Sequence, residues 1–330
     1  MPGASCGGRP RDGGSVTARA PAKVNLVLKV GGLRPDGFHD LVTVFHAVGP
    51  DEEVTVADGP PGVLVRVHGE GAELVPLGEG NLAARAVRAL ADEVGVDLAA
   101  RGVAVAITKR IPVAAGLAGG SGDAAAALVA LDSLWATGLD RERMGALGAT
   151  LGSDVPFALE GGTAVGTGRG EQLAPVPGRG RYHWVLAFSP AGLSTPRVFA
   201  ELDRGRAVDR VGVHPAPGVA GAGAGGVGPT VPPGVLAALR RGDAEALGAA
   251  LDNDLQAPAL RLVPALRECL DVGRERGALG GVVSGSGPTC AFLVRDPDHA
   301  ADVAAALTAA GACRAVVQVT GPAAGASVLG

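Results

Sequence analysis

The first part of the chain alternates apolar and polar residues in runs that predict β-strands. Residues 16–30 read VTARAPAKVNLVLKV and are expected to enter a sheet, with Pro21 at a break between strands. A Pro-Asp-Gly triplet at 35–37 lies between two extended runs and predicts a hairpin, because proline and glycine together favour a tight turn. Valine-rich runs at 53–57 and 63–67 predict further strands.

Helical spacing of apolar residues replaces this alternation after residue 80. Asn81 is a favourable N-cap for a helix that Gly95 should end. A strand at 103–112 should stop at its final proline, and a glycine-rich run then leads into an alanine-rich helix ending near Gly138. A short helix is predicted at 140–151.

The second half continues the mixture of strands and helices. We predict a strand at 182–190, a short helix after 194–196, helices at 235–251, 264–277 and 297–310, a strand-turn-strand at 277–294, and a last strand at 312–319. This order is typical of a ferredoxin-like unit with helices on one face of a sheet. The predicted fold class is therefore α+β.

We expect a flexible N-terminus at 1–15, an N-terminal domain at 16–175 and a C-terminal domain at 182–330. Residues 212–234 are rich in glycine, alanine and proline and have no apolar period, so we expect a disordered insert there.

Composition changes this picture mainly by exclusion. The net charge of −4 offers no overall positive field for nucleic acid or an anionic membrane, and the few aromatic residues are not clustered for base stacking. The four cysteines form no C-x-x-C pair, which argues against a zinc site or a disulfide scaffold. With no signal-like segment and no run of about 18 apolar residues, we expect a cytoplasmic protein that binds neither nucleic acid nor membrane.

The most informative segment for chemistry is the glycine-rich run PVAAGLAGGSGDAA at 112–125. A strand end, a glycine-rich loop and a helix N-terminus together present free backbone N–H groups to an anion such as phosphate. The run is not a Walker A loop, because no Gly-Lys-Ser/Thr follows, and it lacks the G-x-G-x-x-G spacing. The alternative is a helix start in which glycine serves only close packing.

Three polar residues are candidates for chemistry. Strand alternation puts Lys23 and Asn25 on one face, where they need polar partners or a ligand, although an exposed edge strand would also accommodate them. Asp154, in GSDVPF, is either a turn or N-cap residue or a carboxylate that accepts a proton beside a lysine. Such a pair suits phosphoryl transfer, in which positioning and charge stabilisation supply most of the catalysis.

Two loops add candidates. Phe38 and His39 follow the predicted hairpin turn and could stack on or hydrogen-bond a base, or simply pack. The turn SGSGPT at 284–289 is either a tight hairpin or a second backbone cradle for phosphates.

Taken together, PAKVNL, PVAAGLAGGSGDAA and SGSGPT resemble in order and spacing the three motifs of the GHMP kinase superfamily, which includes galactokinase, homoserine kinase and mevalonate kinase. RPDGFH and GSDVPF are similar to the branch that phosphorylates a cytidine diphosphate-linked methylerythritol. The resemblance covers about residues 17–320, excluding the insert at 212–234. It implies a two-domain fold, with a mixed-sheet N-terminal domain (ribosomal protein S5 domain 2-like) and a ferredoxin-like C-terminal domain.

The implied reaction is transfer of a phosphoryl group from ATP, with Mg²⁺, to the 2-hydroxyl of that acceptor, in isoprenoid precursor synthesis. Lys23 and Asp154 would be the catalytic pair, and Asn81 and Lys109 would contact the adenosine part of ATP. The residues implied to hold the ATP phosphates are Pro112, Val113, Ala114, Ala115, Gly116, Leu117, Ala118, Gly119, Gly120, Ser121 and Gly122.

The acceptor, a small molecule carrying a cytidine diphosphate group, would be bound by Asn25, Phe38, His39, Thr195 and Phe199. Of these, His39 would hydrogen-bond the cytosine edge, and the two phenylalanines would enclose the cytosine ring.

The chain departs from the family's pattern at three positions. Phe38 stands where tyrosine is usual, so stacking can persist while a hydroxyl contact is lost. Ala118 stands where glycine is usual and narrows the backbone's freedom, and Gly122 removes a serine hydroxyl. Ser121 is then the remaining candidate ligand for magnesium.

Two alternatives stay open from the sequence. One is another kinase of the superfamily, acting on homoserine, galactose or a mevalonate derivative, for which Phe38, His39 and Phe199 would have no pyrimidine to bind. The other is a catalytically silent nucleotide-binding regulator, which the altered phosphate loop favours and the retained Lys23 and Asp154 oppose.

Overall fold

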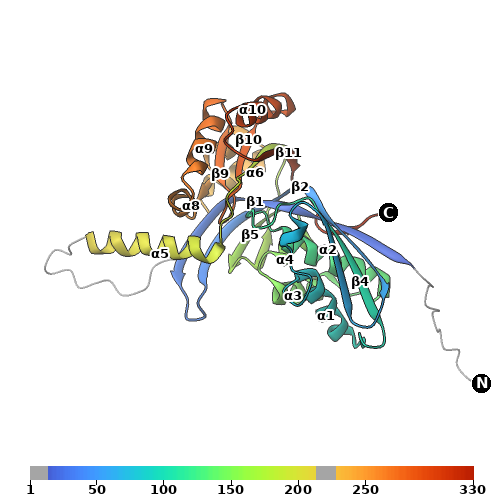
Figure 1. The fold of residues 1–330 in the computed structure, drawn as a ribbon. Helices are drawn as coiled ribbons and strands as arrows, with labels where there is room; N and C mark the ends of the chain where they lie inside the picture. Colours follow the sequence, from blue (N-terminus) through green and yellow to red (C-terminus); the bar gives the residue numbers. More distant parts are fainter. Residues whose placement is uncertain (1–13, 213–227) are drawn as a thin grey trace, which may run out of the picture.

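The computed structural model describes residues 14–212 and 228–330, and Figure 1 shows their arrangement. The expected flexible segment at 1–15 lies outside the described residues except for its end, where Ser15 already begins a strand. Of the expected insert at 212–234, residues 213–227 lie outside the described residues. Gly212 ends one helix and Pro233 begins another, so helical structure reaches into both ends of that range.

A mixed sheet of eight strands organises the first half of the molecule. Its strands are β1 (Ser15–Leu33), β2 (His39–Gly59), β3 (Val63–Gly69), β4 (Gly102–Lys109), β5 (Thr163–Gly168), β6 (Gln172–Pro175), β8 (Asp252–Asn253) and β12 (Ser327–Val328). The main order is β12-β1-β2-β4-β3, while β5 and β6 extend from β2, and β8 pairs with β1. The end of the chain therefore returns to the sheet in which the chain begins.

The long β1–β2 hairpin is the frame of this sheet. The predicted turn at 35–37 connects its strands. The prediction of a break at Pro21 is wrong, because β1 continues through this residue with only a shift of register on its C-terminal side. β2 pairs with β5 over 41–46 and with β4 over 53–59, so one strand connects two parts of the sheet.

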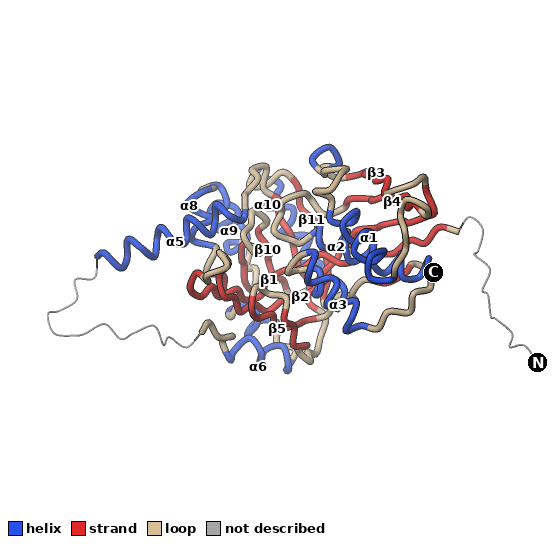
Figure 2. Tube along the Cα trace, turned by 90° about the horizontal axis from the view of Figure 1, so that it is seen from below, coloured by secondary structure: helices blue, strands red, loops and turns tan. Residues whose placement is uncertain are grey.

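Four α-helices belong to this half: α1 (Leu82–Val94), α2 (Gly119–Trp135), α3 (Arg141–Leu151) and α4 (Val155–Glu160), preceded by a 3-10 turn at Ala72–Leu74. Helices α1, α2 and α4 pack against the first sheet, and α3 packs on these three helices. Figure 2 shows α1, α2 and α3 grouped beside the strands. Helix α1 has the predicted caps, because the Asn81 side chain accepts the N–H of Ala84 and Gly95 adopts a left-handed conformation.

The second sheet is antiparallel, with the order β11-β7-β10-β9. Its strands are β7 (Tyr182–Phe188), β9 (Gly280–Val283), β10 (Cys290–Val294) and β11 (Ala315–Gly321). The helices of this half are α5 (Thr195–Gly212), α6 (Pro233–Arg241), α7 (Ala244–Ala249), α8 (Gln256–Leu262), α9 (Ala265–Glu275) and α10 (Pro297–Ala309). In the described ranges, no helix combines the length and apolar character needed to cross a membrane.

Alternation along β7 divides the apolar core of this half. Trp184 and Leu186 belong to a core shared with α6, β1 and the loop before α2. Val185 and Ala187 face the opposite side, where they pack in the core that contains α9 and α10 residues. The shared core lies directly beneath the glycine-rich loop and joins the two halves of the molecule.

Several elements differ from the sequence prediction. The predicted helix at 235–251 is two helices, α6 and α7, because Gly242 adopts a left-handed conformation that ends the first. The helix after 194–196 is longer than predicted, since α5 has 18 residues. The sequence did not predict α8, β8 or β12, which are short and have little periodicity.

Candidate active site

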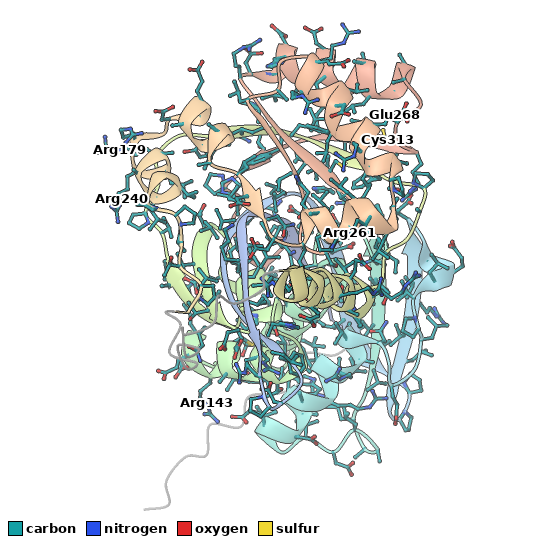
Figure 3. All side chains as sticks on the ribbon, turned by 90° about the vertical axis from the view of Figure 1, so that its left-hand side faces the viewer. Arg143, Arg179, Arg240, Arg261, Glu268 and Cys313 are labelled. Atoms are coloured by element: carbon teal, nitrogen blue, oxygen red, sulfur yellow. The ribbon has the colours of Figure 1, made fainter. Side chains whose placement is uncertain are left out.

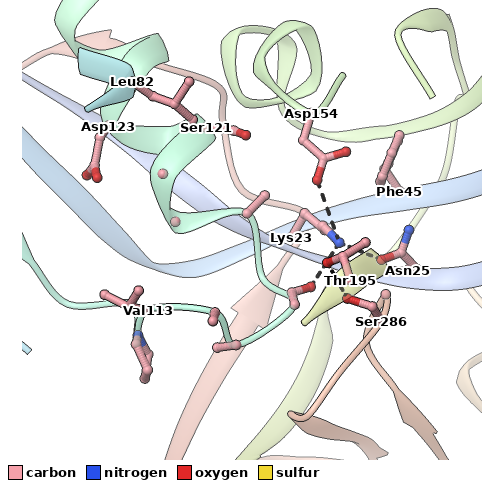
Figure 4. A pocket seen from close by; sticks show the side chains of 18 of the residues that line it. Lys23, Asn25, Phe45, Leu82, Val113, Ser121, Asp123, Asp154, Thr195 and Ser286 are labelled. Carbon is pink, nitrogen blue, oxygen red and sulfur yellow. Dashed lines mark hydrogen bonds and ion pairs between the residues drawn. The ribbon is translucent and has the colours of Figure 1, made fainter. Parts of the chain in front are cut away.

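A cavity of about 420 Å³ lies where the two halves meet, and Figure 4 shows part of its lining. Its wall contains the loop before α2, the start of α1, the middle of β1 and β2, and the turn between β9 and β10. Most of the residues that the sequence singled out line it: Lys23, Asn25, Asn81, Lys109, Pro112, Val113, Ala114, Ala115, Gly116, Ala118, Gly119, Gly120, Ser121, Asp154, Thr195 and Phe199. Leu117, Gly122, Phe38 and His39 are not part of the wall.

Lys23 and Asn25 lie on the same face of β1, as the alternation predicted. The ammonium of Lys23 donates hydrogen bonds to Asn25 Oδ1 (2.7 Å) and to the carbonyl oxygen of Gly116 (2.9 Å). Asn25 in turn donates to the hydroxyl of Thr43 (2.8 Å), which donates to the carbonyl oxygen of Val27. This chain of contacts fixes the position of the lysine, so the edge-strand explanation does not apply.

Asp154 is the acidic partner of Lys23. Its Oδ2 lies 3.9 Å from Lys23 Nζ, and Figure 4 shows the two side chains pointing toward one another from opposite sides of the cavity. The aspartate side chain is 33% exposed, whereas that of Lys23 is 7% exposed. Burial lowers the pKa of Lys23, and the charge of Asp154 partly offsets that effect.

The N-cap explanation for Asp154 holds only for the backbone. Asp154 precedes α4, but its side chain makes no capping hydrogen bond to that helix. The carboxylate therefore remains available at the cavity wall, within reach of a hydroxyl group placed between it and Lys23.

The loop before α2 has the form of an anion cradle. Gly116 adopts φ of 77°, and a side chain there would collide with the carbonyl oxygen of Ser284 in the β9–β10 turn. Ala114 (φ 55°) and Ala118 (φ 60°) adopt left-handed conformations that normally favour glycine. Ala118 is also the N-cap of α2 and offers no capping side chain, so the first N–H groups of the helix are free to face a ligand.

The second glycine-rich turn supports this cradle from the C-terminal half. The hydroxyl of Ser284 donates to the carbonyl oxygen of Gly116 (3.1 Å), and that of Ser286 lies 2.8 Å from the hydroxyl of Thr195. Asn253 donates to the carbonyl oxygen of Gly285 (2.7 Å) and holds the turn in place. The two glycine-rich segments are thus in contact, with Lys23 between them and Asp154.

Lys109 lies in the most buried ion-pair cluster of the cavity wall. Its ammonium is 2.5 Å from Glu52 Oε1 and 2.8 Å from Asp123 Oδ2, and all three side chains are buried. Burial raises the pKa of Glu52 to about 7, and the charge of Asp123 acts in the same direction. Burial also raises the pKa of Asp123, which has a second oxygen, Oδ1, without a hydrogen-bond partner.

Asn81 lines the cavity and caps α1 at the same time. Its Oδ1 accepts the Ala84 N–H (3.0 Å), and its Nδ2 donates to the carbonyl oxygen of Pro76 (2.9 Å). The structural role inferred from the sequence is therefore present, and one amide hydrogen remains for a ligand.

One stacked aromatic pair and one cation–π contact lie near the hairpin tip. His39 stacks on Phe199 with ring centroids 5.0 Å apart, and its Nε2 lies 3.0 Å from Asp203 Oδ1 of α5. Phe38 is 51% exposed, and the guanidinium of Arg169 lies over its ring at 5.1 Å. Phe199 and Arg169 line the cavity. Phe199 contacts His39, and Arg169 contacts Phe38, so both hairpin-tip residues lie directly behind the cavity wall.

The two serine positions of the loop differ in direction. Ser121 lines the cavity, while a side chain at Gly122 would point toward Glu52 and Pro21 in the interior. Loss of the hydroxyl at Gly122 therefore leaves the cavity wall unchanged. Within residues 14–212 and 228–330, no group of three or more His, Cys, Asp or Glu side chains could hold a metal ion.

Several lining residues were missed in the sequence. Asp123 stands within the glycine-rich run and Thr43 within a predicted strand, but neither has a spacing that indicates a role. Arg169 lies in the turn between β5 and β6, and Glu52 is beneath the cavity as a partner of Lys109. Glu52 stands between Asp51 and Glu53, just before the strand predicted at 53–57, so its sequence context resembles that of an exposed acidic residue.

Comparisons with known proteins agree with this site. "GHMP kinases N terminal domain" matches residues 81–162, and "GHMP kinases C terminal" matches residues 235–313. The 4-diphosphocytidyl-2-C-methyl-D-erythritol kinase of Mycolicibacterium smegmatis is 53% identical over 316 residues, which cover 96% of this chain and 93% of the relative. The kinase of that name from Thermobifida fusca is 53% identical over 322 residues, covering 96% and 98%.

Solved structures give the same result. A crystal structure of 4-(cytidine 5'-diphospho)-2C-methyl-D-erythritol kinase has a TM-score of 0.71 and 34% identity, covering 92% of this chain and 98% of the other. Mevalonate kinase of L. major, in complex with R-mevalonate, has a TM-score of 0.71 at 18% identity, covering 94% and 97%, and shows the fold alone. The predicted two-domain α+β fold is confirmed. The chain is a kinase of the GHMP superfamily and belongs, within it, to the family of 4-diphosphocytidyl-2-C-methyl-D-erythritol kinases.

Proposed function

We propose that the protein phosphorylates the 2-hydroxyl of 4-diphosphocytidyl-2-C-methyl-D-erythritol with ATP and releases ADP, in the synthesis of isoprenoid precursors. The observation that carries the proposal is the Lys23–Asp154 pair, 3.9 Å apart, beside a glycine-rich helix N-terminus in one cavity. The names of the similar kinases give the acceptor. A soluble cytoplasmic enzyme that binds neither nucleic acid nor membrane fits this chemistry.

Asp154 is the general base of the proposed mechanism. Its exposed carboxylate would accept the proton of the acceptor hydroxyl as the oxygen attacks the γ-phosphorus of ATP. The bond from that phosphorus to the β-bridging oxygen breaks, and ADP leaves. Lys23, held by Asn25 and Gly116, would stabilise the charge on the transferred group without moving.

ATP would bind with its phosphates at the N-terminus of α2. Free N–H groups of the first turn and the backbone of 112–118 face the cavity there. Asn81 and Lys109 would lie beside the adenosine part. Two carboxylates already neutralise Lys109. Lys109 would therefore hold this part of the cavity wall in place more than it would attract phosphate.

The side chains of the glycine-rich loop suit a magnesium ion that is bound mainly by the phosphates of ATP. Mg²⁺ usually keeps several waters and takes only one or two protein ligands beside phosphate oxygens, so a dense acidic cluster is not required. The hydroxyl of Ser121 would be a protein ligand, and the carboxylate of Asp123 is close in sequence and also lines the cavity. The ion, when bound, neutralises charge on the phosphates.

The acceptor's base would lie at the opposite end of the cavity. Phe199 offers an aromatic face, and His39 lies directly behind it. Phe38 would approach the other side of the ring, and Thr195 and Asn25 would contact the remainder of the acceptor.

The test is ADP release by the purified protein with magnesium and ATP. We expect turnover with 4-diphosphocytidyl-2-C-methyl-D-erythritol and none with homoserine, galactose, mevalonate or phosphomevalonate. Turnover with one of the other acceptors would overturn the proposed acceptor but keep the kinase chemistry. Binding of ATP without any turnover would favour the silent regulator.

A further inference from the structure

Arg169 has no role in the chemistry described so far, yet it is one of three cationic residues in the cavity wall. The others are Lys23 and Lys109. Lys109 is neutralised by two carboxylates within 2.8 Å, and Lys23 is committed to Asn25, Gly116 and Asp154. Arg169 is therefore the cation of this wall that is most available to a second anionic ligand.

The partners of Arg169 leave most of its hydrogen-bonding capacity unused. Its Nε lies 3.7 Å from Glu171 Oε1, which is too long for a hydrogen bond. The Glu171 carboxylate instead accepts the backbone N–H of Arg169 at 2.7 Å and so fixes the turn. The Arg169 side chain is 34% exposed, and its guanidinium rests on the Phe38 ring. That ring supports the flat guanidinium while its edge N–H groups stay free.

The sheet register places Arg169 at the acceptor end of the cavity. Gly168 of β5 lies opposite Leu41 of β2, and Gly166 lies opposite Thr43. Leu41 follows His39 by two residues on β2, and His39 stacks on Phe199; Leu41, Phe199 and Arg169 all line the cavity. Gly168 and Gly170 both have positive φ, which holds Arg169 on a tight turn between them.

We propose that Arg169 binds the diphosphate of the acceptor and determines specificity for a cytidine diphosphate-linked substrate. The inference rests on the proposed function, which supplies an acceptor with two linked phosphates. Arginine suits this role because its planar guanidinium can donate two parallel hydrogen bonds to phosphate oxygens. With its guanidinium over the Phe38 ring, Arg169 would lie between the base, near Phe199, and the reacting hydroxyl, near Asp154.

The test compares cytidine with CDP as ligands, because they differ only in the diphosphate. Their dissociation constants would be measured by calorimetry, with a saturating non-hydrolysable ATP analogue in the nucleotide site. We expect the wild-type protein to prefer CDP, and Arg169→Gln to reduce that preference at least about tenfold, as is typical of a lost hydrogen bond to a charged group. Arg169→Lys should keep an intermediate preference, because lysine retains the charge but lacks the fork.

Steady-state kinetics give the second readout. Arg169→Gln should raise KM for the acceptor by a similar factor while kcat and KM for ATP change less than about twofold. Arg240→Gln is the matched control, since it removes the same charge from an exposed arginine on α6 that does not line the cavity. Figure 3 labels this side chain at the edge of the molecule. Arg240→Gln should leave the ligand preference unchanged.

Two outcomes overturn the inference. If Arg169→Gln kept the wild-type dissociation constants for both cytidine and CDP, the arginine would not bind the diphosphate. An equal loss of cytidine and CDP affinity would assign Arg169 to the base through Phe38. If the wild-type protein bound neither ligand and did not turn over the acceptor, the proposed function itself would fail, and the inference with it.

Discussion

Lys23 and Lys109 lie in the same cavity wall and are both buried, but their surroundings differ. Lys109 is surrounded by two buried carboxylates, Glu52 and Asp123, which satisfy its charge completely. Lys23 donates to neutral oxygens and has one partly exposed carboxylate, Asp154, at 3.9 Å. The first arrangement stabilises a fixed wall, and the second leaves both charges able to interact with a substrate. Burial of a lysine therefore does not by itself identify a catalytic group.

The largest expected effect concerns the Lys23 region. Asp154→Asn should lower kcat at least about 100-fold, because the base that accepts the hydroxyl proton is lost. ATP binding, measured by calorimetry, should remain. Asp58→Asn is the control, since it removes an exposed carboxylate that pairs with Arg101 outside the cavity wall and should not lower kcat by this much. If Asp154→Asn retained more than about a tenth of wild-type turnover, Asp154 would not be the general base.

The next effect separates the two lysines by stability. Lys109→Met leaves two buried carboxylates without their cation and should lower the free energy of unfolding by about 3–5 kcal/mol. Lys23→Met should cost less stability, because its partners are neutral or partly exposed, but should abolish most turnover. Denaturant unfolding and kcat of both variants test this. Equal losses of stability would contradict the distinction between the two regions.

The pH dependence of stability should reveal the Lys109 region. Burial raises the pKa of Glu52 from 4.5 to about 7, so the folded protein binds a proton over this range that the unfolded chain does not. Protonated Glu52 contributes up to about 3 kcal/mol to the free energy of unfolding. This contribution is fully present below about pH 4.5 and is lost as the pH rises through about 7.

The measurement is the difference in unfolding free energy between the wild type and Glu52→Gln as the pH changes. The comparison with Glu52→Gln is needed because the titration of His46 changes the free energy of unfolding with pH in the opposite direction over part of the same pH range. Burial lowers its pKa to about 3, so its stabilising effect is lost as the pH falls from about 6.5. A difference that does not change between pH 4.5 and 7 would show that Glu52 does not titrate there.

The smallest effect concerns backbone strain in the loop beside Lys23. Ala118→Gly should raise the free energy of unfolding by about 0.5–1 kcal/mol, because glycine adopts φ of 60° without steric cost. Ala136→Gly, at φ of 51° at the C-terminus of α2, is the matched control outside the cavity wall. Both variants should be stabilised, but only Ala118→Gly should change KM for ATP. If both variants changed KM for ATP, the effect would be transmitted through α2.

Much of the fold was predictable because its signals are local. The hairpin turn at 35–37, the caps of α1 at Asn81 and Gly95, and the strand-loop-helix at 112–125 depend on neighbouring residues. The elements that were missed or divided wrongly have weak local signals. β12 has two residues and exists only because β1 offers it an edge, and α6 and α7 are separated by the single residue pair at 242–243.

The candidate site was predictable in its motifs and less so in its contacts. The sequence by itself determined the glycine-rich cradle, the common face of Lys23 and Asn25, and the family, since spacing and residue type carry these features along the chain. The resemblance already implied that Lys23 and Asp154 act as a pair, and the tertiary structure places their side chains 3.9 Å apart although 131 positions separate them in the sequence. The tertiary structure alone decided that Glu52 and Asp123 neutralise Lys109 and that the guanidinium of Arg169 lies over the Phe38 ring. These contacts join residues far apart in sequence, and electrostatic energy depends on distance and burial, which only the packed structure defines.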